Sequence, residues 1–310
     1  LSGKKLAEVK TWHKLNMETL QRTANRGSVS TGYDIDNSLK LEADNSEFLT
    51  QTIGTGNRRT ATYSFWIKRT ELGGTQQVAG ISPIGSETVR AMFVTDTLKV
   101  ETGVGGDNNT LTTNRLFRDT SAWYHIVVGI DTTDGTEANR VKVYVNGVQE
   151  TSFSTATYPA QNTDLTIGVS GNTWQYGAYD ASNYKTNGYI AEAHYIDAQQ
   201  LAPTAFGEFD EDSGIWKPIA YAGAYGAQGH YLDFKDSADL GANAKGNDAN
   251  FTLTNIAAAD QSTDTPTNNF CTLNPLVNFK YTTNGITEGG TTFGDDTGGG
   301  VGGAFGTMAV

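Results

Sequence analysis

The stretch that decides the fold is Trp123-Tyr-His-Ile-Val-Val-Gly-Ile-Asp131, followed by Val141-Lys-Val-Tyr-Val-Asn-Gly-Val148. Its first half is the most apolar run of the chain and predicts a centrally placed strand. In its second half, apolar and polar residues alternate and end at Asn146-Gly147, the strongest short-range signal for a tight hairpin turn. We therefore expect the two segments to lie side by side as inner strands of two stacked antiparallel sheets.

The same alternation continues on both sides of this stretch. Further strands are predicted at Ser38–Glu42, Ala61–Arg69, Val89–Val94, Thr97–Glu101, Leu165–Val169, Gly188–Asp197 and His230–Phe234. Helices do not alternate with these strands, which excludes a parallel nucleotide-binding sheet. Many short strands joined by turns are typical of an all-β sandwich or jelly roll.

The composition agrees with an all-β protein and excludes several classes of partner. The chain has 310 residues, 36 of them Gly, and a formal net charge of −12. That charge repels phosphate backbones, and the clusters Lys4-Lys5 and Arg58-Arg59 are too small to offset it, so a nucleic-acid partner is not expected. No apolar run is long enough to span a membrane. The single cysteine, Cys271, leaves no intrachain disulfide and no Cys-based metal site.

Three regions are predicted along the chain. Residues 1–32 form an N-terminal helix and linker, 33–255 form the sandwich, and 256–310 form an extended Gly- and Thr-rich segment that leads to a further β module. The helix is predicted over 4–26, between Ser2 as N-cap and Gly27 as stop signal. Its apolar stripe is expected to dock on another protein or on sister chains, with packing on its own domain as the equal alternative. The stripe contains Leu6, Val9, Trp12 and Leu20.

Three stretches together resemble the concanavalin A-like lectin/glucanase superfamily in its laminin-G-like branch. The first is Thr60-Ala-Thr-Tyr-Ser-Phe-Trp-Ile-Lys-Arg69, and the second is the pair of strands that ends at the Asn146-Gly147 turn. The third is Gly188-Tyr-Ile-Ala-Glu-Ala-His-Tyr-Ile-Asp197 with the capping helix and turn that follow it at Pro203–Phe209. The resemblance covers about residues 36–235 and implies a concanavalin-like antiparallel sandwich.

Further stretches are similar to structural proteins of tailed phages, marine ones in particular. They are Phe206-Gly-Glu-Phe-Asp-Glu-Asp-Ser-Gly-Ile-Trp-Lys-Pro218, Gly229-His-Tyr-Leu-Asp-Phe234 and Asp264-Thr-Pro-Thr-Asn-Asn-Phe-Cys-Thr-Leu-Asn-Pro275. This resemblance implies a non-enzymatic structural protein at the virion surface, in a tail fibre, an appendage or a capsid decoration. Its expected partners are other virion proteins and sister chains, with a homotrimer favoured for a fibre.

The alternative function is a carbohydrate-binding adhesin that recognises a host surface glycan. The insertion at 171–188 carries aromatic residues whose flat rings could stack on sugars. The equally open reading is that these rings pack on the sandwich or on a partner subunit. The candidates are Trp174, Tyr176, Tyr179 and Tyr184.

Two further kinds of chemistry are weighed against a purely structural role. No cofactor is required, but Ca²⁺ could bind oxygen ligands in loops. The alternative is that these residues bond to their own backbone, as Asp and Asn in turns usually do. The candidate ligands are Asp131, Asp134, Asp236 and Asp239, with Asn243, Asn247 and Asp248 near the second pair. Glycan hydrolysis by Glu208, Asp210 and Asp212 is the least favoured function, because the run is flanked by turn residues and is expected to be a solvated acidic turn.

Overall fold

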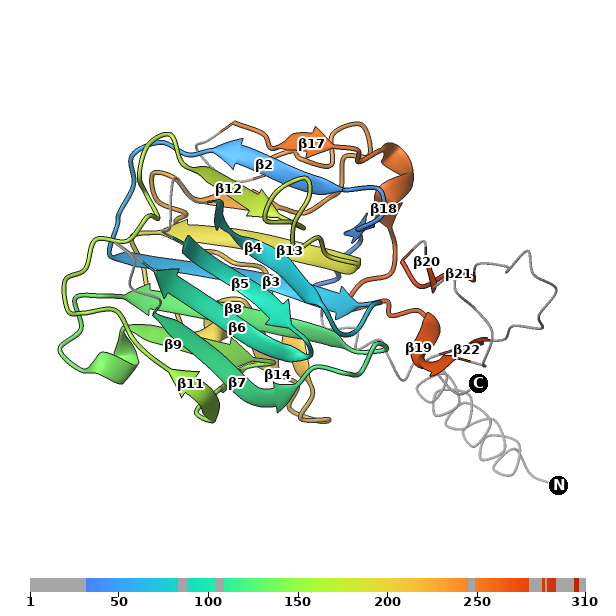
Figure 1. Ribbon diagram of the computed structural model, residues 1–310, viewed down its shortest axis with the longest axis horizontal. Coiled ribbons are helices and arrows are strands. Elements are labelled where there is room, and N and C mark those ends of the chain that lie inside the picture. The colour runs from blue at the N-terminus through green and yellow to red at the C-terminus, as the bar shows by residue number, and fades with distance from the viewer. Residues whose placement is uncertain are drawn as a thin grey trace, which may run out of the picture.

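Two antiparallel sheets face one another as a sandwich in this protein (Figure 1). The structure is a computed structural model that describes residues 32–82, 88–103, 109–244, 249–278, 286–287, 289–293 and 304–306. The predicted all-β antiparallel sandwich is therefore confirmed. The predicted N-terminal helix and its stripe lie outside the described residues.

Sheet A holds the stretch that decided the fold. Its strands follow the order β10 (Val148–Gln149), β9 (Val141–Val145), β8 (Trp123–Asp131), β3 (Thr60–Arg69), β13 (Gly188–Asp197), β1 (Ser38–Leu41) and β18 (Gln261–Ser262), with β16 (His230–Leu232) also paired to β13. The apolar strand β8 lies between β9 and β3, the central position that its composition predicts.

Sheet B closes the other side of the sandwich. Its order is β11 (Phe153–Ala156), β7 (Thr110–Leu116), β6 (Thr97–Gly103), β5 (Thr88–Val94), β4 (Thr75–Ser82), β12 (Thr173–Tyr176), β2 (Phe48–Thr52) and β17 (Thr252–Thr254). The insertion between residues 171 and 188 thus contributes strand β12 between β4 and β2 before it emerges as a loop.

The hairpin of β9 and β10 has the register that its turn requires. Val145 pairs with Val148, and the two central turn residues have positive φ, 48° at Asn146 and 79° at Gly147. This backbone twist matches that of the flanking strands. Glycine is required at position 147 for a second reason, because a Cβ there would collide with the indole ring of Trp216.

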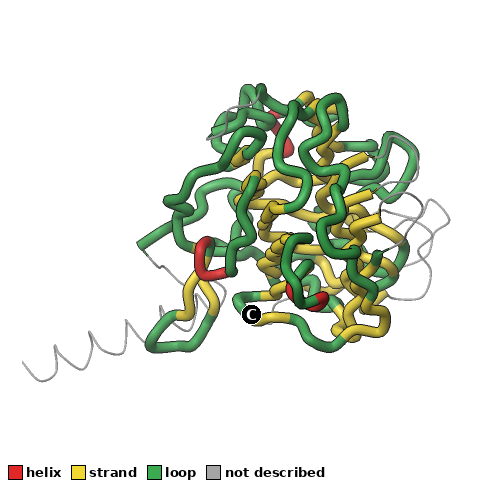
Figure 2. Tube along the Cα trace, turned by 90° about the vertical axis from the view of Figure 1, so that its left-hand side faces the viewer, coloured by secondary structure: helices red, strands yellow, loops and turns green. Residues whose placement is uncertain are grey.

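Alternate side chains of each sheet meet in one core between the sheets. On β8, Ile126, Val128 and Ile130 point into this core, and Phe93 of β5 and Trp174 of β12 meet them from the opposite side. The outward-facing side chains of sheet A are also buried, because a third layer of irregular chain covers them (Figure 2). Strand β8 therefore has both faces covered, which explains its nearly continuous apolar sequence.

The third layer is built from segments that follow β13 in the chain and cover the outer face of sheet A. It includes η2 (Pro203–Ala205), the hairpin of β14 (Gly207–Phe209) and β15 (Trp216–Pro218), and the segment 264–270. The predicted capping helix after β13 is present as η2, whereas the turn predicted after it is corrected, since residues 207–209 form a strand. The sandwich also extends past the predicted boundary at residue 255, because β18 pairs with β1 and Asp264 is buried against sheet A.

One predicted strand is wrong. Residues Leu165–Val169 form turns, and the side chains of Leu165 and Ile167 are buried in the core. The apolar alternation reflects this burial, but no neighbouring strand is available. The segment instead exchanges isolated backbone hydrogen bonds with residues 56–58, and Gly168 at φ 71° lets the two backbones approach closely.

Short elements complete the described structure. The helices within the described ranges are three 3-10 turns, η1 (Glu137–Asn139), η2 and η3 (Ala258–Asp260), and none of them could cross a membrane. The described parts of the C-terminal segment pair as two ribbons, β19 (Leu273–Asn278) with β22 (Ala304–Gly306) and β20 (Ile286–Thr287) with β21 (Thr292–Phe293).

Candidate functional site

The four aromatic residues predicted to bind a glycan divide into two pairs. Trp174 and Tyr176 are fully buried in the core, where Trp174 packs against the rings of Tyr63 and Tyr195. Neither ring can contact a ligand from solvent, which corrects their assignment as binding residues. The reason is that strand β12 lies inside sheet B, so alternate side chains point between the sheets.

Tyr179 and Tyr184 follow that strand and reach the surface. Their ring centroids are 5.7 Å apart, and Tyr184 is 41% exposed. The guanidinium carbon of Arg90, from the outer face of β5, lies 5.1 Å from the ring centroid of Tyr179 and 5.6 Å from that of Tyr184. We call these three residues the tyrosine–arginine platform. Cation–π attraction between guanidinium and ring holds it together.

The backbone of the loop presents Tyr184 in a strained conformation. Its φ is 54°, in the left-handed region, which costs a non-glycine residue about 1–2 kcal/mol. The carbonyl of Tyr184 accepts a hydrogen bond from the Gln77 amide at 2.7 Å, and the amide of Tyr179 donates to the carbonyl of Asn183 at 3.2 Å. Strain that the surrounding structure maintains is typical of binding loops.

Side chains beneath the loop hold it in place. The Asp180 carboxylate accepts the backbone amides of Ser182 at 2.7 Å and Asn183 at 2.8 Å, which closes a tight turn. These bonds, with those from the Asn183 side chain, lower the pKa of Asp180. The side-chain amide of Gln175, oriented toward the loop, donates to the carbonyls of Ala178 and Tyr179. The platform is therefore preorganised by its own chain.

Arg90 lies within a row of charges across the outer face of sheet B. Its Nε donates to Glu101 at 2.6 Å, and the Lys99 ammonium lies 2.5 Å from the same carboxylate. Burial raises the pKa of Glu101, but the hydrogen bonds and charges of Lys99 and Arg90 outweigh it, so this pKa lies below its usual range. Gly80 leaves the space that Arg90 needs, because a Cβ there would collide with the Arg90 Cβ.

Sequence reasoning missed Arg90. Its strand, Thr88–Val94, is predicted correctly, and the alternation places Arg90 on the outer face opposite Glu101. What the sequence does not show is that β4 separates this strand from β12, so that the loop after β12 passes over Arg90. Pairing between distant strands brought the residues together.

A second surface feature, the aromatic groove, lies on the opposite side of the molecule. It has a volume of about 410 Å³ and lies between the β14–β15 hairpin, the start of β8 and the segment 264–270. Its floor is built from tryptophans of sheet A and the third layer, while Phe209 and Ile215 at its rim are 49% and 50% exposed. Its lining includes Trp66, Trp123, Phe209, Ile215, Trp216 and Pro266.

The observed architecture is a sandwich of two antiparallel sheets, with β8 and β9 paired in sheet A. It agrees with the family whose model matches the sequence. The Laminin_G_3 model, described as concanavalin A-like lectin/glucanases superfamily, matches residues 41–198 and thus half of the chain. The chain belongs to this superfamily. The matched residues run from the end of β1 to the end of β13, and they include the whole tyrosine–arginine platform.

Solved structures with similar folds were found, and no curated protein sequence matches the chain. A heptameric pentraxin from Limulus polyphemus is 17% identical with a TM-score of 0.41, over 55% of this chain and 80% of the pentraxin. A putative carbohydrate-binding protein from Bacteroides ovatus is 15% identical with a TM-score of 0.47, over 72% and 59%. Tailspike protein 2 of an Escherichia coli O157:H7 bacteriophage is 12% identical with a TM-score of 0.40, over 55% and 23%.

The chain spans 59% of the length of the Bacteroides protein and 23% of the tailspike. At these identities and TM-scores, neither carries a function over to it.

The predicted calcium ligands of this superfamily member do not come together. Asp131 accepts bonds from the amide and hydroxyl of Thr133, and Asp134 accepts the amide of Thr136. Asp236 accepts the amide of Ala238 in the same way.

Asp239, the fourth candidate, accepts the amide of Gly241 and the side chain of Asn250. Among the residues that the structure describes, no three His, Cys, Asp or Glu side chains gather as a metal site. Asn247 and Asp248 lie outside the described residues. The alternative, that these carboxylates bond to the backbone of their own turns, accounts for their geometry.

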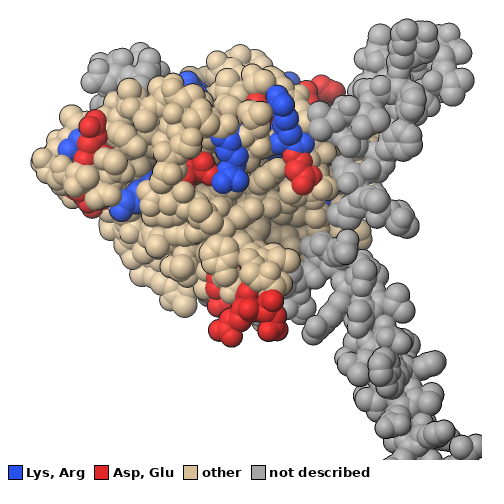
Figure 3. Space-filling model, turned by 90° about the horizontal axis from the view of Figure 1, so that it is seen from below, with Lys and Arg blue, Asp and Glu red and all other residues tan. Residues whose placement is uncertain are grey.

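The acidic run forms the tip of the β14–β15 hairpin, where carboxylates project from the domain (Figure 3). The amide and hydroxyl of Ser213 donate to Asp210 and, with Lys217, lower the pKa of Asp210 to about 2. Lys217 also lies 3.2 Å from Glu208, which is exposed. Asp210 is therefore committed to closing the turn, as the solvated-turn hypothesis expects.

His125 is buried beneath the third layer, and its hydrogen bonds determine its tautomer. The Trp216 indole N–H donates to Nδ1 at 3.0 Å, so the proton resides on Nε2, which lies 2.8 Å from the Ser64 hydroxyl. Burial, with a smaller effect of His194, lowers the pKa of His125 to about 3. The ring is thus a neutral packing element between Trp66 and Trp216.

A buried carboxylate cluster lies at the bulge of β13. Glu192, at φ 49°, accepts hydrogen bonds from the hydroxyls of Tyr33 and Tyr231, both at 2.7 Å, and lies 3.6 Å from His194. Burial raises the pKa of Glu192, but these partners outweigh it and lower that pKa. Both of its oxygens are occupied, so the cluster ties Tyr33 to sheet A and has no free group for catalysis.

Proposed function

We propose that this chain is a non-enzymatic carbohydrate-binding module whose ligand site is the tyrosine–arginine platform. The observation that supports the proposal is an exposed tyrosine in a strained left-handed backbone, beside a second tyrosine and over an arginine. The strain of such a residue is consistent with a role in recognition.

The platform has the chemistry that a sugar requires. The apolar C–H face of a pyranose packs on an aromatic ring, and the ring pair of Tyr179 and Tyr184 supplies such a face at the surface. The tyrosine hydroxyls and the Arg90 guanidinium are donors that can bond to sugar hydroxyls. Because the loop is already held by Asp180 and Gln175, little conformational entropy is lost on binding.

A glycan array tests this proposal. Specific binding by the native chain should be lost in Tyr184→Ala and reduced in Arg90→Met. Phe209→Ala, which removes an exposed ring on the opposite side of the molecule, is the control and should leave the signal unchanged. Binding that survives Tyr184→Ala, or a native chain without any specific signal, would exclude the platform as the site.

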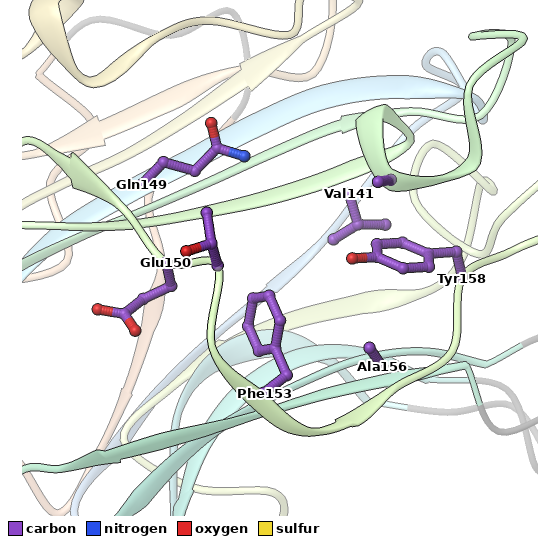
Figure 4. A pocket seen from close by; sticks show the side chains of 8 residues that line it. Val141, Gln149, Glu150, Phe153, Ala156 and Tyr158 are labelled. Carbon is purple, nitrogen blue, oxygen red and sulfur yellow. The ribbon is translucent and has the colours of Figure 1, made fainter.

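A second function is favoured by the open side of the sandwich, where β10 ends sheet A and β11 ends sheet B. Unpaired strand edges can pair with another chain. Exposed apolar side chains lie here, Val148 at 53% and Leu116 at 49%. A cavity of about 270 Å³ separates the two edges, with the rings of Phe153 and Tyr158 turned into it beneath Val141 (Figure 4).

We propose that the chain self-associates through this edge and, as its sequence resemblance to tailed-phage structural proteins implies, is also a structural protein of a phage virion, displayed extracellularly in a fibre, an appendage or a decoration. Its partners would be sister chains in a trimer and other virion proteins. Analytical ultracentrifugation of the native chain should show a trimer, and Val148→Asp should shift it to monomer. A monomeric native chain at high concentration would rule out self-assembly through this edge.

Glycan hydrolysis is the competing function, and its candidate catalytic residues are the carboxylates of the β14–β15 hairpin. Asp210 closes the turn and Glu208 pairs with Lys217, so neither is poised as a buried general acid. We expect no glycosidase activity in the native chain and no change in Glu208→Gln. An activity that this substitution abolished would replace the binding function by a catalytic one.

A further inference from the structure

We propose that residues 4–26 of the same chain dock in the aromatic groove, beside the acidic tip of the β14–β15 hairpin. The rim of the groove exposes two large apolar side chains, Phe209 and Ile215. Phe209 packs edge-on against Trp216 with ring centroids 4.9 Å apart, yet half of Phe209 and half of Ile215 remain exposed. Apolar rims around a cavity of this kind are typical of surfaces that bind a polypeptide.

The place where the described chain begins connects this groove to residues 4–26. Tyr33 and Ile35 pack against a cluster that contains Trp66, Trp123 and Trp216, the tryptophans that line the groove. The tyrosine is further held by its hydrogen bond to Glu192. Residues 27–32, fully extended, can span about 20 Å, so the segment before them is tethered within reach.

Charge favours the same occupant. Residues 4–26 contain six Lys and Arg residues against two Glu residues, a formal net charge of +4 in a chain whose net charge is −12. The hairpin beside the groove presents the opposite sign, with Glu211 and Asp212 exposed at its tip and Glu208 exposed on β14, where it pairs with Lys217. Opposite charges at the edge of an apolar contact set orientation and register.

The apolar pattern of the segment completes the match. Leu6, Val9 and Trp12 recur at helical spacing, and such a stripe is stable in water only when it is covered. The groove offers aromatic and aliphatic side chains to cover it. Docking on the chain's own domain selects one of the alternatives that the sequence leaves open, and it is independent of carbohydrate binding at the platform.

Amide hydrogen exchange of the full chain tests the proposal. In the native chain, amides of residues 4–26 should exchange at least roughly tenfold more slowly than in the double variant Phe209→Ser/Ile215→Ser. The variant Tyr184→Ser removes an exposed ring away from both the groove and the proposed assembly edge, and it should keep the native protection. The substituted side chains are all exposed, so the melting temperature of each variant should stay close to that of the native chain, which checks that the sandwich is intact.

A further variant tests the docking from the side of the segment, without any change to the groove. Lys4→Glu/Lys5→Glu/Lys10→Glu reverses charge only within the segment and should remove the protection, as should high salt by screening. Protection must not depend on protein concentration. The proposal is overturned if the native segment exchanges at unfolded-peptide rates, if Phe209→Ser/Ile215→Ser leaves it protected, or if protection rises with concentration, which would assign the groove to a second copy.

Discussion

The ammonium of Lys68 lies 2.7 Å from the carboxylate of Asp264 in the interior of the protein, with 0% and 6% of the two side chains exposed. Lys68 comes from strand β3 and Asp264 from the third layer. Asn269 and the carbonyl of Phe270 complete the shell around the ammonium, while the indole of Trp123 donates to the carboxylate at 3.1 Å. Every charge is therefore paired, and the network attaches the third layer to sheet A.

Removing one partner of this pair should be strongly destabilising. Asp264→Ala leaves the Lys68 charge buried without a counter-ion, and such a loss costs about 3–5 kcal/mol of the free energy of unfolding. Replacing both residues, as Lys68→Met/Asp264→Leu, should cost less than Asp264→Ala alone, because no charge then remains buried. Urea unfolding followed by tryptophan fluorescence measures both.

The exposed pair of Arg59 and Asp164 is the matched control. Its side chains are 42% and 48% exposed, so solvent screens the interaction. Asp164→Ala should therefore leave the free energy of unfolding nearly unchanged. An Asp264→Ala variant as stable as Asp164→Ala would contradict the buried network.

Stability should fall in mild acid because of two buried histidines. Burial, with a smaller effect of His194, lowers the pKa of both His125 and His230 to about 3. The unfolded chain protonates the same rings near about pH 6.5. Protons therefore bind preferentially to the unfolded chain as the pH falls, and this contribution to stability, complete above about pH 6.5, is lost progressively toward the folded pKa.

The expected slope is about 2.4 kcal/mol per pH unit between about pH 6 and pH 5, since each histidine contributes about 1.2 while its unfolded form is not yet fully protonated. In His125→Gln the slope should be about half as steep, whatever the absolute stability of the variant. Urea unfolding at several pH values measures it. A free energy of unfolding independent of pH over this range would show that the two rings are accessible to protons in the folded protein.

Tyr184→Gly should separate stability from binding. Glycine adopts positive φ freely, so the substitution relieves about 1–2 kcal/mol of backbone strain against an entropic cost of about 0.5–1 kcal/mol. We expect the free energy of unfolding to stay level or rise by about 1 kcal/mol, and carbohydrate binding to disappear. Tyr179→Gly, where no positive φ is relieved, should lower stability instead.

Trp174→Ala should act on the core and not on a binding surface. The indole is fully buried and its ring contacts include Tyr63, Tyr195 and His230. Deleting it leaves a cavity that costs about 3–5 kcal/mol. Urea unfolding of Trp174→Ala and Trp174→Phe tests this, with the smaller loss in Trp174→Phe. A loss below about 1 kcal/mol in Trp174→Ala would mean that the ring is not in the core.

The sequence predicts some residues of the tyrosine–arginine platform and not others. Tyr179 and Tyr184 are predicted at the surface. Tyr184 is exposed there and Tyr179 is half-buried beside it, because the chain leaves sheet B after β12. Trp174, in the same insertion, was wrong because its segment became a sheet strand. Arg90 could not be predicted, since its proximity to the loop depends on the order of strands in sheet B.

The sequence alone determined which segments are strands around Trp123–Val148, the tight turn at Asn146-Gly147, and the sandwich class, because alternation and turn chemistry are local properties of a chain. Only the tertiary structure decided which rings are buried and which carboxylates are paired. Lys68 with Asp264, and Arg90 with Tyr184, are distant in sequence, and they meet only because strand pairing and layer packing bring separate segments to the same place.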